Sequence, residues 1–310
     1  MPSHRRVRGV SWSLVILGVG LVGCAPEYGD PAPAAGAAAS APIDENEQLG
    51  QDPGAAADTA LSTDAGASGS EEGAPENPGL SQSELDERLR WAVWGNDLDT
   101  AAQLIEWGAD VNAQDSTQQS AFLIATSEGR DELLRLTLEH GADVADLDSW
   151  NGTGLIRAAE RGHWDVAGTL IRAGVDMHHV NRVGYQAIHE AVIFGRDDPT
   201  YHAAVRVLVA GGASLTTPSV TEGQTPLQMA QSRGFSEQIR ILEALDREAP
   251  EHPEAALLAS AASGDADALT LALRAGAAVD TRDPEGRTAL DIAEDGGNLA
   301  AATVLRALGA

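Results

Sequence analysis

Residues 153–176 read TGLIRAAERGHWDVAGTLIRAGVD, and residues 120–143 read SAFLIATSEGRDELLRLTLEHGAD. The two stretches lie 33 residues apart and share one order of features: a small polar residue, an apolar run, a glycine, a leucine-rich run and a Gly-X-Asp tripeptide. The apolar residues of both runs recur at helical spacing, and glycine ends a helix readily because it adopts a left-handed conformation without strain. One period therefore predicts helix, tight turn, helix and protruding loop.

The period runs through residues 81–310. Its marker glycines fall 33 residues apart except twice: an interval of 38 ends at Gly212, and an interval of 64, close to two periods, ends at Gly276. The interval of 38 indicates a five-residue insertion near residues 197–199. The pattern predicts about seven units. The marker glycines are Gly108, Gly141, Gly174, Gly212, Gly276 and Gly309.

The start of the first helix in most units carries a recurring motif. Residues 225–228, Thr-Pro-Leu-Gln, show it best, because threonine caps a helix and proline is tolerated at the first helical position. Related tetrapeptides stand at the same place in other units, and an alanine follows two residues after each. The related tetrapeptides begin at Ser120, Thr153, Gln186 and Thr288, and the alanines are Ala125, Ala158, Ala191, Ala230 and Ala293.

With this period and this motif, the chain from residue 83 to 310 resembles the ankyrin-repeat family. The resemblance implies an all-α fold, an ankyrin-repeat solenoid of about seven helix-turn-helix units with β-hairpin-like loops, over residues 81–310. It also implies protein binding without catalysis. Residues 246–253, DREAPEHP, replace the hairpin between the fifth and sixth units and mark a candidate break. We expect the stack to continue across it.

Residues 1–23 have the composition of an export signal. Basic residues precede the apolar run from Val10 to Val22, which is too short to span a membrane comfortably. The only cysteine, Cys24, follows in the tetrapeptide Leu-Val-Gly-Cys, which resembles the bacterial lipobox. The resemblance implies a mature protein that starts at a lipid-modified Cys24. It would be anchored at the periplasmic side of an outer membrane or at the outer face of a plasma membrane. An unmodified cysteine is the alternative.

Residues 24–80 differ in composition from the repeats. They consist largely of Ala, Gly, Pro, Ser and acidic residues, with scarcely any large apolar side chain. Such a segment cannot bury enough apolar area to offset the entropy lost on ordering. We expect a disordered tether between the lipid anchor and the repeats.

The chain is strongly acidic. It has 47 Asp and Glu residues against 20 basic residues, and its formal net charge is −27. This field repels nucleic acid. It favours a basic protein partner, although an acidic surface that serves only solubility would have the same composition.

No arrangement of residues typical of an enzyme or a metal site stands out. His178 and His179 are adjacent and His163 lies in the same unit, but no third ligand is fixed by their spacing. His189 stands at the histidine position of the motif, where we expect a hydrogen bond between repeats. The sequence therefore predicts no enzyme, no metal and no cofactor.

Aromatic residues are scarce, which makes their positions informative. Trp and Tyr, together with Arg, are enriched at protein interfaces. Trp91 and Trp94 fall on the first helix, and Trp150 and Tyr185 fall at expected hairpin tips. For Trp91 and Trp94, packing beneath the N-terminal end of the array is the alternative. The expected partner-binding residues, on one face of successive units, are Trp91, Trp94, Trp150, Arg157, Arg182 and Tyr185.

These features predict a lipid-anchored, extracytoplasmic scaffold that binds a protein partner through the concave face and hairpin tips of the array. Two alternatives stay open. One is an envelope spacer protein without a specific partner. The other is an immunity or inhibitor protein that faces a basic toxin or enzyme.

Overall fold

The computed structural model describes residues 76–310. The predicted signal segment 1–23, the predicted lipidation site Cys24 and residues 25–75 of the predicted tether lie outside the described residues. The described part contains fourteen α-helices and no strand, apart from two isolated antiparallel bridges in its loops. None of these fourteen helices has the length and hydropathy needed to cross a membrane.

The helices are α1 (Gln82–Trp94), α2 (Leu98–Glu106), α3 (Ala121–Ser127), α4 (Asp131–Glu139), α5 (Gly154–Arg161), α6 (Trp164–Arg172), α7 (Ala187–Phe194), α8 (Pro199–Ala210), α9 (Pro226–Arg233), α10 (Ser236–Leu245), α11 (Pro253–Ser263), α12 (Ala266–Arg274), α13 (Ala289–Asp295) and α14 (Leu299–Ala307).

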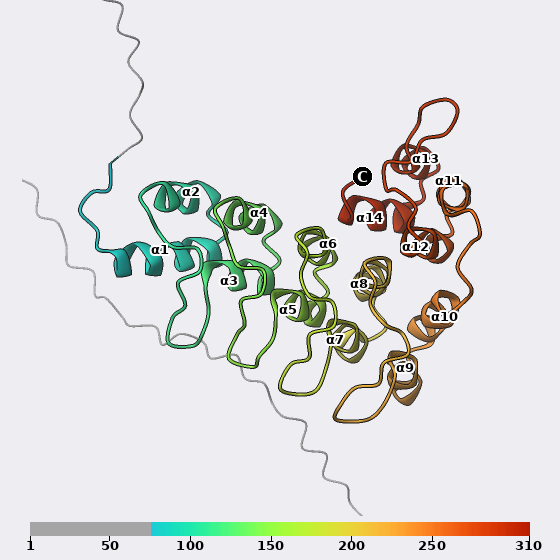
Figure 1. Ribbon diagram of the computed structural model, residues 1–310, viewed down its shortest axis with the longest axis horizontal. Helices are drawn as coiled ribbons and strands as arrows, with labels where there is room; N and C mark the ends of the chain where they lie inside the picture. Colours follow the sequence, from blue (N-terminus) through green and yellow to red (C-terminus); the bar gives the residue numbers. More distant parts are fainter. Residues whose placement is uncertain (1–75) are drawn as a thin grey trace, which may run out of the picture. The chain divides into compact units, whose positions relative to one another are not determined.

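Consecutive helices form seven pairs joined by tight turns, and long loops protrude between most pairs (Figure 1). The odd-numbered helices from α1 to α9 pack side by side in one layer, and the even-numbered helices from α2 to α10 form a second layer. This arrangement confirms the predicted all-α solenoid of helix-turn-helix units.

The helix ends follow the chemistry of the motif. Thr153 precedes α5 and Thr225 precedes α9, and each threonine side chain accepts a hydrogen bond from the backbone N–H three residues later. These bonds satisfy N–H groups that have no partner within the helix. Gly162 and Gly234 end the same two helices at φ 76° and 70°, in the left-handed region that favours glycine.

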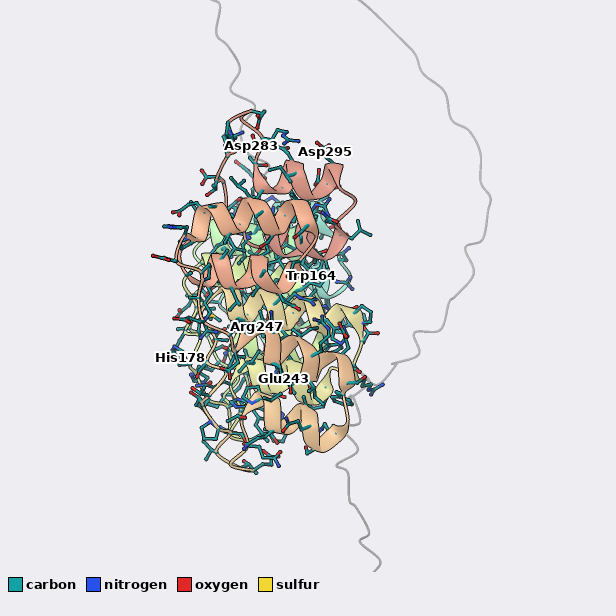
Figure 2. The ribbon with its side chains drawn as sticks, turned by 90° about the vertical axis from the view of Figure 1, so that its right-hand side faces the viewer. Trp164, His178, Glu243, Arg247, Asp283 and Asp295 are labelled. Carbon is teal, nitrogen blue, oxygen red and sulfur yellow. The ribbon has the colours of Figure 1, made fainter. Side chains whose placement is uncertain are left out.

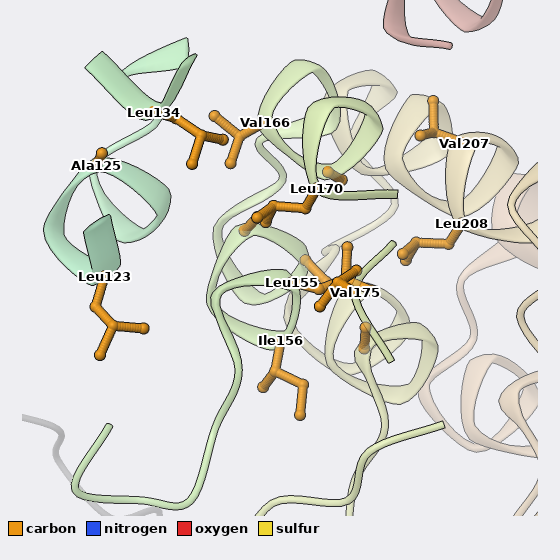
Figure 3. Close-up of a cluster of buried hydrophobic side chains, with 14 of the residues drawn as sticks. Leu123, Ala125, Leu134, Leu155, Ile156, Val166, Leu170, Val175, Val207 and Leu208 are labelled. Atoms are coloured by element: carbon orange, nitrogen blue, oxygen red, sulfur yellow. The ribbon is translucent and has the colours of Figure 1, made fainter. Parts of the chain in front are cut away.

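The core lies between the two layers of helices. The recurring alanines are buried, and their small side chains let neighbouring helices approach closely. Larger apolar residues fill the space between repeats. Leu134 of α4 and Val166 of α6, for example, point toward each other across one repeat junction (Figure 3). The fully buried alanines of the motif are Ala125, Ala158, Ala191, Ala230 and Ala293.

The stack does not continue across residues 246–252. Helix α11 does not take the place beside α9 that each earlier odd-numbered helix takes beside its predecessor. Instead α12 packs against α8 and α10, and α14 packs against α6 and α8. The expectation of a continuous stack is therefore wrong: the last two repeats fold back over the even-numbered helices, and they bury a hydrophobic cluster of their own. Figure 2 views the molecule from this side, with Arg247 of the connecting segment labelled.

Ion pairs stabilise the packing of α12 against α8 and α10. Asp267 of α12 accepts hydrogen bonds from Arg206 Nε of α8, at 2.7 Å, and from Arg240 Nη1 of α10, at 2.8 Å. Asp267 and Arg206 are both buried, so each needs the other's charge. Because residues 246–252 carry no hairpin that could stack on the preceding one, the connection does not impose the regular repeat geometry.

Candidate partner-binding surface

The six residues expected to bind a partner fall into two groups. Trp91, Trp94 and Trp150 are about half exposed, at 53%, 52% and 45%. Arg182 is also exposed. Tyr185 and Arg157 are not presented to solvent in the same way, so the surface is smaller than the sequence predicts.

Trp91 and Trp94 lie one turn apart on α1. Their ring centroids are 5.9 Å apart and the rings meet edge to face, at 84°. The residues of α1 that pack into the array are Leu85, Leu89 and Val93, each at most 2% exposed. The alternative in which Trp91 or Trp94 packs beneath the end of the array is therefore wrong, because both are about half exposed and other side chains of α1 fill that role.

Trp150 and Arg182 lie on neighbouring loops. The backbone N–H of Arg182 donates to the carbonyl of Trp150 at 2.9 Å, and Arg182 Nη1 donates to the carbonyl of Ser149 at 2.6 Å. These bonds hold the two loop tips side by side. They form a second exposed patch, separated from Trp91 and Trp94 by the repeat of α3 and α4.

Arg157 stabilises the loop that carries Trp150. Its guanidinium forms an ion pair with Asp148 and a second one with Glu160. Asp148 also accepts the backbone N–H groups of Trp150 and Gly152, both at 2.8 Å. Arg157 is thus a positioning residue for the loop, with its side chain only 20% exposed.

Tyr185 was expected at an exposed hairpin tip, and this position is wrong. The side chain is 6% exposed and its hydroxyl donates to Glu222, on the loop that follows α8. That loop lies over the loop between α6 and α7, where the N–H of Val220 donates to the carbonyl of Gly184 at 2.9 Å. Burial, followed by the contact with Glu222, raises the pKa of Tyr185.

One buried acid was missed by the sequence reasoning. Glu190 of α7 is 4% exposed, and its Oε1 accepts a hydrogen bond from Asn181 at 2.6 Å. Its Oε2 has no partner among residues 76–310. Burial, and then the nearby carboxylate of Glu160, raise the pKa of Glu190 to about 7. Because Glu190 lies one period after Arg157, the repeat alignment could have flagged it.

Two of the histidines considered as metal ligands lie within hydrogen-bond distance of backbone carbonyl oxygens of the preceding repeat or loop. His179 Nε2 lies 2.7 Å from the carbonyl oxygen of Asn151, and His163 Nε2 lies 3.1 Å from that of Ser127. His189 Nε2 lies 3.1 Å from the carbonyl oxygen of Thr217, a contact between neighbouring repeats as expected. Within residues 76–310 no group of three His, Cys, Asp or Glu side chains is placed to hold a metal ion.

Comparison with known proteins gives a consistent result. A family model described as ankyrin repeats in three copies matches residues 89–181. The ankyrin repeat protein YahD of Escherichia coli (strain K12) is 34% identical over 142 residues, which cover 45% of this chain and 69% of YahD. The nuclear factor NF-kappa-B p105 subunit of Gallus gallus is 30% identical over 160 residues, which cover 50% of this chain but only 16% of p105.

A solved structure is also similar. It is an ankyrin repeat domain from Acinetobacter baumannii AYE, with 43% sequence identity. The match covers 50% of this chain and 79% of that one, with a TM-score of 0.48.

Proposed function

The chain belongs to the ankyrin-repeat family, and from this premise we propose that it is a non-enzymatic scaffold that binds a partner protein through its exposed aromatic and arginine side chains. Ankyrin repeats are protein–protein interaction domains, and proteins of the family are typically binding scaffolds without catalytic activity. A fold alone does not identify a partner, so the side chains on the surface of this chain decide what it binds.

The observation that carries the proposal is the exposure of three tryptophans. Trp91, Trp94 and Trp150 are each about half exposed, although most of the array hides its large apolar side chains. Large aromatic side chains on a surface mark interaction sites, and Trp and Arg dominate the energetics of many interfaces. Trp150 with Arg182 forms one such patch, and Trp91 with Trp94 forms the other.

The acidic charge supports a basic partner. A formal net charge of −27 raises the rate of association with a positively charged protein and repels other polyanions. A basic toxin or enzyme that this array inhibits is one partner of that kind.

The proposed location is the cell envelope, outside the cytoplasm. It rests on the export-signal composition of residues 1–23 and on the lipobox-like tetrapeptide that ends at Cys24. In this proposal an acylated Cys24 anchors the protein to the membrane, and the segment after it lets the array reach its partner.

The test is a pull-down from an envelope extract with the full chain as bait. A Trp150→Ala, Arg182→Ala variant removes one exposed patch without touching the buried core. Tyr185→Phe is the matched control, because Tyr185 is buried. We expect a protein that the native chain and the Tyr185→Phe variant capture and that the double variant loses. Capture of the same proteins by all three chains, or of none by any, would contradict the proposal and favour an envelope spacer.

A further inference from the structure

A hollow of about 700 Å³ lies between α1 and α2, in the first repeat of residues 76–310. Leu104 at its base is buried, whereas the charged residues at its edge are exposed. We name this hollow the end groove. The lining residues that matter here are Arg88, Trp91, Asp97, Asp99, Leu104 and Trp107.

The end groove is unusual for the end of a repeat array. End repeats need a polar outer face, because no neighbour covers them. Here Trp91 lines the groove and remains 53% exposed, with Trp94 at its side. Among residues 76–310 no cation stacks on either indole. The first repeat thus offers solvent an aromatic pair that a polar cap would not have.

The charges around this pair are mainly negative. Asp99 is exposed and makes no hydrogen bond or ion pair within the described part of the chain. Asp97 caps α2 through Thr100 and keeps its negative charge at the same edge. Arg88 is the single basic residue of the groove. The indole faces and the Asp99 carboxylate both favour a cation, since a cation binds the negative face of an aromatic ring.

A second copy of this chain is a poor occupant. Two first repeats placed end to end would bring Asp97 and Asp99 against their own counterparts, and each chain has a net charge of −27. Like charges across an interface are unfavourable. A basic segment has the opposite sign and supplies the missing cation.

We propose that the end groove binds an arginine- or lysine-bearing segment of the partner protein, with one cationic side chain held on the Trp91–Trp94 pair and ion-paired with Asp99. This inference rests on the proposed function and adds to it a location and a class of ligand. It places the contact at the end of the array, away from the loop tips that carry Trp150.

The test measures binding of a fluorescent Arg-Ser repeat peptide of about twelve residues to the full chain by anisotropy, at about 50 mM and 500 mM salt. A Glu-Ser peptide of the same length is the ligand control. Trp91→Ala removes the aromatic face, and Trp91→Leu removes it while keeping apolar volume. Asp99→Asn removes one charge. The matched controls are Leu299→Ala, an apolar residue of α14 that is 74% exposed, and Asp295→Asn, whose side chain is 73% exposed on α13.

We expect both Trp91 variants to weaken binding of the Arg-Ser peptide about tenfold. Asp99→Asn weakens it about threefold, and the two control variants change it less than about twofold. Binding that is unchanged in the Trp91→Leu variant, equal losses in Asp99→Asn and Asp295→Asn, or equal binding of the Glu-Ser peptide would each overturn the inference. If partner capture persists while the peptide test fails, only this inference falls; if the peptide binds but no partner is captured, the proposed function falls.

Discussion

Gly168 of α6 lies directly against the main chain of Ala307 in α14. A Cβ atom at position 168 would overlap the carbonyl oxygen of Ala307, and Arg172, one turn later on α6, donates a hydrogen bond to that same oxygen. These contacts join the last helix of the chain to the third repeat. They make the fold-back of the C-terminal repeats sensitive to a single methyl group.

Gly168→Ala should therefore destabilise the protein by about 1–3 kcal/mol, the usual cost of overpacking a tight contact. The added methyl pushes α14 away from α6, so the connecting segment 246–252 should also be cleaved faster in limited proteolysis. Urea denaturation and a protease time course measure the two effects. Gly95→Ala is the control, because Gly95 has a helical φ of −73° and an added Cβ there meets its nearest neighbour at 3.3 Å. Equal stability of the two variants would contradict the close packing of Gly168 against Ala307.

Asp267→Asn should lower the free energy of unfolding strongly, although aspartate and asparagine have nearly the same size and shape. The change removes the charge that Arg206 and Arg240 share, and Arg206 is only 8% exposed. Leaving a buried charge without its partner costs about 3–5 kcal/mol. Denaturant unfolding of the variant gives the free-energy loss. The same substitution at the exposed Asp295 should change it by less than about 0.5 kcal/mol, and a similar loss at both positions would show that the ion pairs contribute little.

Glu190 should make stability fall as pH rises from about 4.5 to about 7. Its pKa is about 7 in the folded protein, against 4.5 for an ordinary glutamate, so the folded state keeps a proton that the unfolded chain has lost. This difference amounts to about 3 kcal/mol across the window. Glu190→Gln keeps an acceptor for Asn181 and cannot ionise, so stability above pH 7 should rise in this variant. Urea denaturation at pH 5 and pH 8 checks it, and an unchanged difference between the two pH values would contradict the prediction.

Cys24→Ser should abolish incorporation of a labelled fatty acid into the protein. The sulfur is the atom that acylation would modify, and Cys24 is the only cysteine of the chain. Metabolic labelling followed by membrane fractionation measures both lipid and location. Label retained by the serine variant, or absent from the native chain, would remove the basis of the proposed anchor.

The repeat itself could be read from the sequence because its signals are local. Thr153 caps the N-terminus of α5 and Gly162 caps its C-terminus, and both caps act within a few residues. The alanine positions follow from helical spacing. Exposure of Trp150 followed from its expected place at a hairpin tip, whereas for Trp91 and Trp94 the sequence left exposure and packing beneath the end of the array both open.

The rest depends on contacts between distant residues. Tyr185 is buried by Glu222, 37 residues later, and nothing near Tyr185 in the sequence indicates how far the next loop leans over it. The Arg206–Asp267 ion pair spans 61 residues and follows no period. Gly168 did carry a signal, because a glycine within a helix lowers its stability and often marks a close approach of another backbone.

Closure of α14 onto α6 also changes how the chain would fold. In a linear array each repeat meets only its neighbours, so the contact order is low and the ends can unfold one repeat at a time. Here Arg172 meets Ala307 across 135 residues. Forming that contact closes a long loop, which slows folding, and once formed it ties the unfolding of the last repeats to that of the third.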